Sequence, residues 1–73
     1  MNLPSTLPIT LIGPALRIIR RDQKIKQYIA AQDIGITQAY LCQIEKGNRM
    51  PILVVLSKML DYYGYDFKIE ERL

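Results

Sequence analysis

The sequence predicts an all-α domain of four helices, followed by a short β-strand. Three observations support this prediction. Apolar residues recur at helical spacing through most of the chain, a glycine separates two short helical segments at its centre, and the last residues alternate between apolar and polar. The 73 residues suffice for a single domain whose core alone gives only marginal stability, so we also expect a homodimer.

Composition argues against several classes of function. The chain has no histidine and one cysteine, so we expect no disulfide framework, no Cys/His metal site and no histidine-based catalysis. Without a nucleophile–base pair we expect neither an enzyme nor a cofactor. The uncharged first 16 residues are interrupted by prolines and a glycine, and no basic residue precedes them, so they predict neither a signal peptide nor a membrane span. The expected compartment is the cytoplasm.

The net charge of +3 is unevenly distributed along the chain. Between Arg17 and Arg49 there are seven basic and three acidic residues, whereas from Met50 to Leu73 there are three basic and four acidic residues. A basic excess over one part of a small domain is typical of a polyanion-binding face. An ordinary solvated surface would give the same counts, so charge alone leaves both interpretations open.

Residues 1–11 predict an extended N-terminal arm, because two prolines hold the residues before them out of the helical region. The arm has no lysine or arginine, which favours packing against protein over entry into a minor groove. A first helix begins between Thr10 and Pro14 and ends near Gln23. The later start is favoured because proline suits the first helical position. Its core-facing stripe comprises Ile12, Ala15, Leu16 and Ile19.

The segment Ile25–Lys46 predicts two short helices joined by a turn. The first is expected over Lys26–Asp33 and the second over Gln38–Lys46, with Gly35 at the turn and Thr37 as the second N-cap. The residues expected to face the core are Ala30, Ala31, Ile34, Ile36, Leu41 and Ile44. The opposite face of the second helix is then polar or small and comprises Gln38, Ala39, Cys42 and Gln43.

A fourth helix is expected to run to Tyr63, with Pro51 just ahead of it or at its start and Gly64 at its C-terminal cap. Its predicted core face comprises Leu53, Leu56, Met59, Leu60 and Tyr63. The unbroken apolar run at its start exceeds what one helical face can bury. The predicted dimer or partner surface therefore includes Ile52, Val54 and Val55, although an oversized core would account for them equally well.

In the last residues the spacing of apolar side chains changes from that of a helix to that of a strand. Tyr65, Phe67 and Ile69 alternate with polar residues, which predicts a strand within residues 65–73. A lone strand cannot satisfy its own backbone or bury its apolar face. It therefore needs a partner, either the N-terminal arm or the same strand of a second subunit, and we assign these three residues to the dimer surface as well.

The centre of the chain resembles the helix-turn-helix of the Cro and phage-repressor family, also called the XRE type. In this family, a glutamine stands at the start of the first motif helix. A small residue lies four positions after the glutamine, and a glycine lies four positions after the small residue. Apolar residues lie six and nine positions after the glycine. The matching residues are Gln27, Ala31, Gly35, Leu41 and Ile44. The run Ile44–Pro51 also resembles the family, whereas Ala30 stands where leucine is usual and Ile52 where a polar cap is frequent.

The resemblance covers residues 12–63 and implies a four-helix, lambda-repressor-like DNA-binding domain. Within the family, the C-terminal part is most similar to HipB-like antitoxins, in which the fourth helix is followed by a strand that pairs across the dimer. That second resemblance rests on the alternation in Tyr65–Leu73. It implies a toxin protein as a further partner.

The family resemblance also implies which residues contact double-stranded DNA. Base-reading positions are occupied by Gln38, Ala39 and Gln43, and the methyl groups of Ala39 or Thr37 suit a thymine methyl. Glutamine offers a donor and an acceptor, as adenine requires, so contact is favoured over an exposed side chain without a role. The phosphate candidates are Gln27, Lys26, Lys46, Asn48 and Arg49. A structural salt bridge is implied between Arg20 and Glu45.

Cys42 lies on the predicted DNA-facing side of the second motif helix. A redox switch would require a cationic neighbour and a resolving cysteine, and the chain has no second cysteine. We therefore interpret Cys42 as a small residue near DNA.

These features predict a sequence-specific transcriptional regulator that represses by occupying a palindromic operator as a homodimer. The alternative is an antitoxin that holds a toxin protein and autoregulates its operon. The apolar surface Ile52–Val55 and the acidic, strand-forming tail favour that alternative. We expect no membrane partner in either case.

Overall fold

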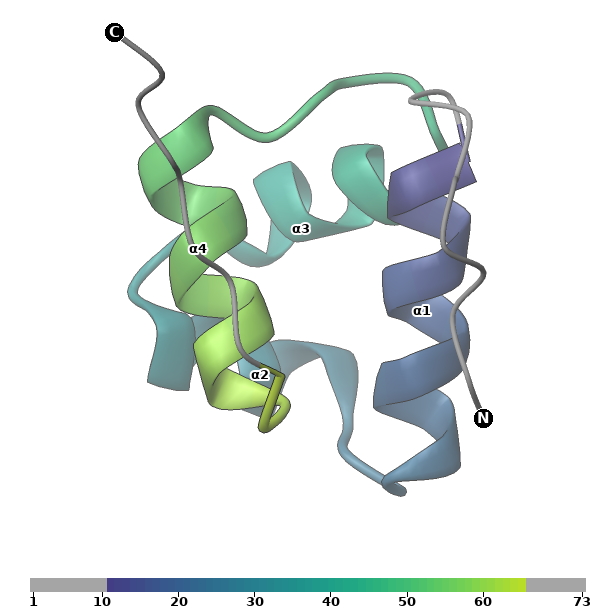
Figure 1. Cartoon of the computed structure of the whole chain (residues 1–73), viewed down its shortest axis with the longest axis vertical. Helices are drawn as coiled ribbons and strands as arrows, with labels where there is room; N and C mark the ends of the chain where they lie inside the picture. Colours follow the sequence, from purple (N-terminus) through teal and green to yellow (C-terminus); the bar gives the residue numbers. More distant parts are fainter. Residues whose placement is uncertain (1–10, 66–73) are drawn as a thin grey trace, which may run out of the picture.

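The structure is a computed structural model that describes residues 11–65. It contains α1 (Ile12–Asp22), α2 (Gln27–Ile34), α3 (Gln38–Glu45) and α4 (Leu53–Tyr62), with no strand in this part of the chain. α1 packs against α3, and α2 packs against both α3 and α4. In Figure 1, α1 and α4 stand on opposite sides of the molecule with α3 between them. The prediction of four helices, two of them in a helix-turn-helix, is confirmed.

The two predicted terminal segments fall mainly beyond the described range. Tyr65 is described and is not in a strand, while Phe67 and Ile69 lie outside the described residues. The predicted N-terminal arm lies outside them as well up to residue 10. The predicted C-terminal strand, and its pairing across a dimer, therefore stay predictions.

One hydrophobic core joins all four helices. Four of its side chains are almost completely buried, and burying a large aliphatic side chain contributes about 1.5–3 kcal/mol; they are Leu16, Leu41, Ile44 and Met59. The other buried apolar residues are Ile19, Ala30, Ala31, Ile34, Val55 and Tyr63. Of the core-facing residues predicted for the helix-turn-helix segment, five are buried and Ile36 is half-buried.

α1 begins at Ile12, ahead of the favoured start at Pro14, so Gly13 lies inside the helix. Pro14 is tolerated there because the first N–H groups of a helix have no intrahelical partner. Gly13 is buried against α3, and a Cβ at this position would overlap the carbonyl oxygen of Ile44. The close approach of the two helix backbones thus depends on the absence of a side chain.

The turn between α2 and α3 follows the prediction closely. Gly35 has a φ of 90°, a left-handed conformation that glycine adopts without steric cost, and its N–H donates to the carbonyl of Ala31 at 2.9 Å. Thr37 caps α3, because its Oγ1 accepts a hydrogen bond from the backbone N–H of Tyr40 at 3.1 Å. These interactions between residues close in sequence help to define the turn that joins the two helices.

α4 differs from the prediction in the face that it buries. It begins at Leu53, so Pro51 lies just ahead of the helix, which is one of the two predicted placements. Val55, assigned from the sequence to a partner surface, is only 9% exposed, whereas Leu53, assigned to the core, is 51% exposed. The assignment was wrong because an unbroken apolar run contains two helical stripes, and packing against α2 selects the one that includes Val55.

The C-terminal end of α4 agrees with the prediction. Gly64 follows the helix with a φ of 90°, and its N–H donates to the carbonyl of Asp61 at 3.0 Å. The N–H of Tyr65 donates to the carbonyl of Leu60 at 2.8 Å. This pair of bonds is the pattern of a Schellman cap, which satisfies carbonyls left free at a helix end.

Candidate nucleic-acid interface

α3 has two distinct faces. Leu41 and Ile44 are fully buried on the inner face, whereas Gln38, Ala39 and Gln43 are all exposed on the outer face. Cys42 lies on the same outer side and is half-buried. The three residues predicted to read bases are therefore presented together on one helix, and a ligand could reach them without any rearrangement of the core.

Gln27 links the starts of both motif helices. It lies at the N-terminus of α2, where its Nε2 donates to Oε1 of Glu45 at 3.0 Å and its Oε1 accepts from Nε2 of Gln38 at 3.3 Å. The backbone N–H groups and the dipole at a helix N-terminus favour an anion. Gln27 thus holds Gln38 in place from a position that itself suits a phosphate group.

A buried ion pair joins α1 to the last turn of α3. Nε of Arg20 lies 2.7 Å from Oε2 of Glu45 and Nη2 lies 2.9 Å from Oε1, while Nη1 donates to the carbonyl of Ile25 at 2.7 Å. The hydrogen bonds to Glu45 raise the pKa of Arg20. A buried pair adds little net stability because desolvation offsets the attraction, but it constrains geometry strongly. It therefore fixes the orientation of α3.

The loop between α3 and α4 adds a second set of contacts. Nδ2 of Asn48 donates to Oε1 of Gln43 at 3.1 Å. The guanidinium of Arg49 lies 5.2 Å from the centre of the Tyr40 ring, a cation–π contact worth about 0.5–1 kcal/mol at an exposed site. The Tyr40 hydroxyl also accepts from the N–H of Ile52 at 3.4 Å. Asn48 and Arg49 are thereby held beside the outer face of α3.

The predicted phosphate contacts lie at both ends of α3. Lys26 precedes α2, Lys46 follows α3, and Asn48 and Arg49 lie in the next loop; all four are exposed. The sequence had indicated these residues and the Arg20–Glu45 pair. It had not indicated the bonds of Gln27, or the support that Asn48 and Tyr40 give to their neighbours. Residue spacing carries no signal for those tertiary contacts.

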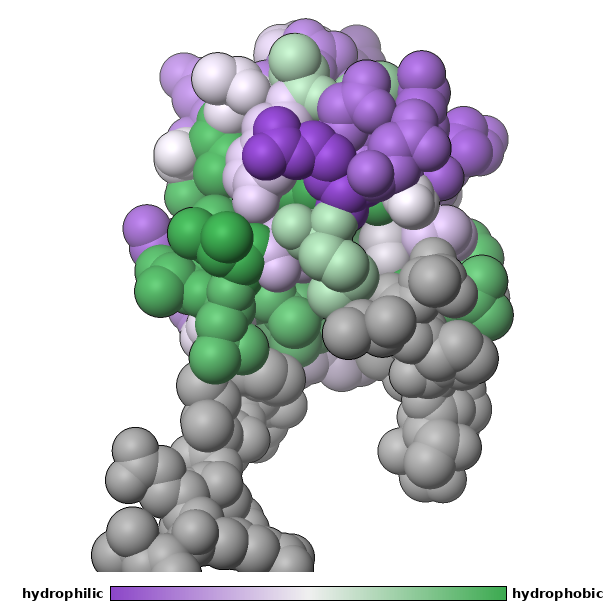
Figure 2. All heavy atoms as spheres, turned by 90° about the horizontal axis from the view of Figure 1, so that it is seen from above, coloured by the Kyte–Doolittle hydropathy of each residue, from purple (hydrophilic) through white to green (hydrophobic). Residues whose placement is uncertain are grey.

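A separate apolar surface lies at the start of α4. Its exposed members, which we call the apolar shelf, are Met50, Ile52, Leu53 and Val54. Figure 2 shows hydrophobic side chains gathered on the side that α4 occupies in Figure 1, next to a strongly hydrophilic region. Of the residues predicted for a partner surface in this segment, Ile52 and Val54 belong to the shelf, whereas Val55 is buried. Leu53, predicted to lie in the core, belongs to the shelf instead.

Other kinds of site find no support among residues 11–65. In that range no group of three His, Cys, Asp or Glu residues could hold a metal ion. Nor does any helix there have the length and apolar character needed to cross a membrane. The polar outer face of α3 and its flanking cations are thus the best-developed candidate site in the described part of the chain.

Comparison with known protein families points to the same segment. A family model described as helix-turn-helix matches residues 16–69, which is well over half of the chain. The match contains α2, α3 and every residue assigned above to base or phosphate contact. No curated protein matches the chain.

Proposed function

Because the chain belongs to the Cro/C1-type helix-turn-helix family, also called XRE, of DNA-binding transcription regulators, we propose that it is a repressor. It would bind a palindromic operator in double-stranded DNA as a homodimer and block transcription by occupying it. The observation that carries the proposal is the outer face of α3, where Gln38 and Gln43 are exposed and each is held by another side chain.

The supporting bonds leave both glutamines able to read a base. Gln38 gives one N–H to Gln27, and among residues 11–65 its second N–H and its carbonyl oxygen have no other partner. Adenine presents an acceptor at N7 and a donor at N6 in the major groove, which matches that remaining pair. Gln43 accepts from Asn48 and keeps both N–H donors. Ala39, between them on the same face, suits a thymine methyl, as does the methyl of Thr37.

The flanking residues supply contacts that position the protein without reading sequence. Lys26, Lys46 and Arg49 are exposed cations, and Asn48 is an exposed amide in the same loop as Arg49. Side chains of this kind, together with the N-terminus of α2 at Gln27, bind phosphate oxygens on either side of a groove. The buried Arg20–Glu45 pair acts by orienting α3 between them.

The homodimer rests on the apolar shelf and on the size of the domain. A small core gives limited stability, and an exposed apolar cluster marks an interaction surface. A second copy that covers Ile52, Leu53 and Val54 would remove this apolar surface from water. Half-sites read by such a dimer lie about 34 Å apart, one turn of DNA.

Substitution of each glutamine tests the proposal. A preferred duplex is first selected from a random library, and binding to it and to a mixed-sequence duplex is measured by fluorescence anisotropy. Gln38→Ala or Gln43→Ala should cost about 1–3 kcal/mol on the selected duplex and relax the preference at one base pair. Gln32→Ala removes an exposed glutamine from α2 and is the matched control. Equal weakening on both duplexes would exclude base reading by these residues.

The second candidate function is an antitoxin whose main task is to hold a toxin protein. The apolar shelf favours it, because the same exposed surface would fit a different protein. The product of a neighbouring gene is the partner to test. A stable complex with that product, lost on substitution of Ile52 or Val54, would support the antitoxin. A homodimer that binds DNA with no such complex would support the repressor alone.

A further inference from the structure

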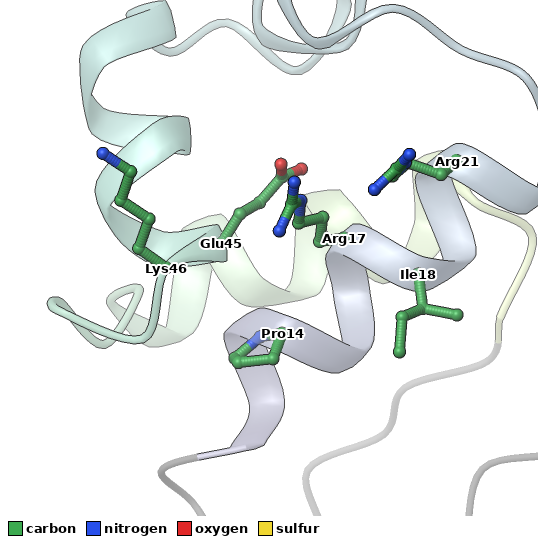
Figure 3. A pocket seen from close by; sticks show the side chains of 6 residues that line it. All are labelled: Pro14, Arg17, Ile18, Arg21, Glu45 and Lys46. Atoms are coloured by element: carbon green, nitrogen blue, oxygen red, sulfur yellow. The ribbon is translucent and has the colours of Figure 1, made fainter.

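A shallow hollow of about 400 Å³ lies between α1 and the C-terminal end of α3. Figure 3 shows the side chains that line it, which are Pro14, Arg17, Ile18, Arg21, Glu45 and Lys46. Arg17 and Arg21 reach toward Glu45 from α1, whereas the side chain of Lys46, on the other side of the hollow, extends away from them in this view. Three of the six lining residues are cations, contributed by segments far apart in the sequence.

The one anion in the hollow is already neutralised. Glu45 lines the hollow, but its carboxylate accepts two hydrogen bonds from Arg20 and one from Gln27, so the positive charge of Arg20 balances its negative charge. Within residues 11–65, the only ion pair is the one between Arg20 and Glu45. Arg17, Arg21 and Lys46 are exposed and have no carboxylate partner in that range. The hollow is therefore a site of net positive charge without a counter-ion.

Helix dipoles explain two of these cations but not the third. Arg21 lies in the last turn of α1 and Lys46 caps α3, where the negative end of a helix favours a cation. Arg17 lies in the middle of α1, and its neighbour four residues on is the like-charged Arg21. Like charges at this spacing destabilise a helix. An anion between them would convert this repulsion into attraction.

We propose that the hollow binds a phosphate of the DNA backbone, so that α1 extends the footprint of the helix-turn-helix. This inference rests on the proposed DNA binding. Continuity with the interface supports DNA as the source of the phosphate, because Glu45 is bonded to Gln27, which is bonded in turn to Gln38. Arg17 and Arg21 are thereby assigned as phosphate contacts, with Lys46 shared between the hollow and the end of α3.

Binding measured over a range of salt concentrations tests the assignment. The probe is a fluorescein-labelled 20-base-pair duplex of mixed sequence, titrated with the full chain between about 50 and 200 mM salt. Arg17→Gln should reduce the slope of log K against log salt by about 0.9 and weaken binding by roughly eightfold at about 0.1 M salt. Arg17→Gln with Arg21→Gln should reduce the slope by about 1.8 and weaken binding by roughly sixtyfold.

Lys58→Gln is the matched control, since it removes one exposed cation from α4. It should leave the slope unchanged, and an equal loss with Lys58→Gln would overturn the assignment in favour of a diffuse effect of net charge. Thermal unfolding should show midpoints for the Arg17 variants no lower than that of the original chain, because both side chains are exposed.

Two results separate this inference from the proposed function. If the original chain binds neither the mixed-sequence duplex nor a selected one, the proposed function itself fails. If it binds, and Arg49→Ala reduces the slope while both Arg17 variants do not, only the phosphate site in the hollow is refuted. Binding of a polyglutamate peptide, weakened by Arg17→Gln, with no effect of that variant on DNA, would assign the hollow to an acidic protein instead.

Discussion

The end of α3 buries a charged residue, whereas the start of α4 exposes apolar residues. Glu45 is charged and only 2% exposed, whereas Val54 is apolar and 62% exposed. Carboxylates are almost never fully buried unless they are paired, and a cluster of exposed apolar side chains marks an interaction surface. The first departure is compensated inside the chain, by Arg20 and Gln27. The second has no such compensation among the residues described.

The contrast separates the buried pair that orients α3 from the exposed surface that we propose as a partner interface. Burying the Arg20–Glu45 pair costs desolvation energy that its attraction only offsets, so its contribution is a fixed geometry rather than stability. The apolar shelf leaves hydrocarbon in water, so it gains stability only when another surface covers it. Each region can be altered without touching the other, because they lie on different helices.

The largest expected effect comes from breaking the buried pair. Glu45→Ala should lower the free energy of unfolding by about 3–5 kcal/mol, because it leaves Arg20 as a buried charge without a partner. Urea denaturation followed by circular dichroism measures this loss. Replacing both residues by methionine should recover most of it, since an apolar pair of similar size avoids the unpaired charge. A loss below about 1 kcal/mol for Glu45→Ala would contradict the role assigned to the pair.

Substitutions in the apolar shelf should instead weaken association and leave the stability of the monomer nearly unchanged. Ile52→Ser with Val54→Ser should change the unfolding free energy of the monomer by less than about 0.5 kcal/mol, because both side chains are exposed. The dissociation constant of the proposed homodimer should rise about tenfold or more, equivalent to about 1.4 kcal/mol. Analytical ultracentrifugation at several concentrations measures this change. Tyr28→Ser, an exposed residue on α2, is the control, and an unaltered dimer in the double variant would remove the shelf from the interface.

The smallest of these expected effects comes from the Tyr63 hydroxyl, a buried polar group without the hydrogen-bond partners that Glu45 has among residues 11–65. Tyr63 is buried, and within residues 11–65 its hydroxyl has no hydrogen-bond partner. Removing an unsatisfied hydroxyl relieves its desolvation penalty, so Tyr63→Phe should raise the free energy of unfolding by about 1 kcal/mol in denaturant titrations at neutral pH. Tyr62→Phe instead loses a hydrogen bond of 2.7 Å to Asp33 and should not stabilise.

The same tyrosine predicts a dependence on alkaline pH. Burial raises the pKa of Tyr63 above its ordinary value of 10.0, so the folded state favours the neutral hydroxyl. This contribution is fully present below pH 10 and is lost as the pH rises beyond it, because only the unfolded chain ionises readily there. Tyr63→Phe should therefore flatten the decline of stability above pH 10, and an identical decline in both proteins would exclude Tyr63 as its source.

The sequence contained enough local information to predict most of the helical framework. The left-handed Gly35, the Thr37 cap and the core positions of α2 and α3 depend on residue type and spacing, which can be read without a structure. The family pattern also paired Arg20 with Glu45, and the two lie in contact. These features were accessible because neighbours in sequence, or a recurring motif, specify them.

The rest depended on packing between segments. Leu53 and Val55 belong to different helical stripes of equal apolar character, and only the position of α2 decides which is buried. In the same way, the cation–π contact between Arg49 and Tyr40 depends on the path of the loop between α3 and α4. The hollow between Arg17 and Lys46 exists because α1 lies against the end of α3. No periodicity in a single sequence encodes these relations.

Gly13 has a consequence for how this architecture can vary among related proteins. Its backbone contacts the carbonyl of Ile44 with no space for even a methyl group, so the two helices meet at a fixed pivot near the end of α3. Any side chain at this position would force α1 or α3 to shift. The identity of one residue on α1 therefore limits how closely α3 can pack, independently of the residues on its outer face.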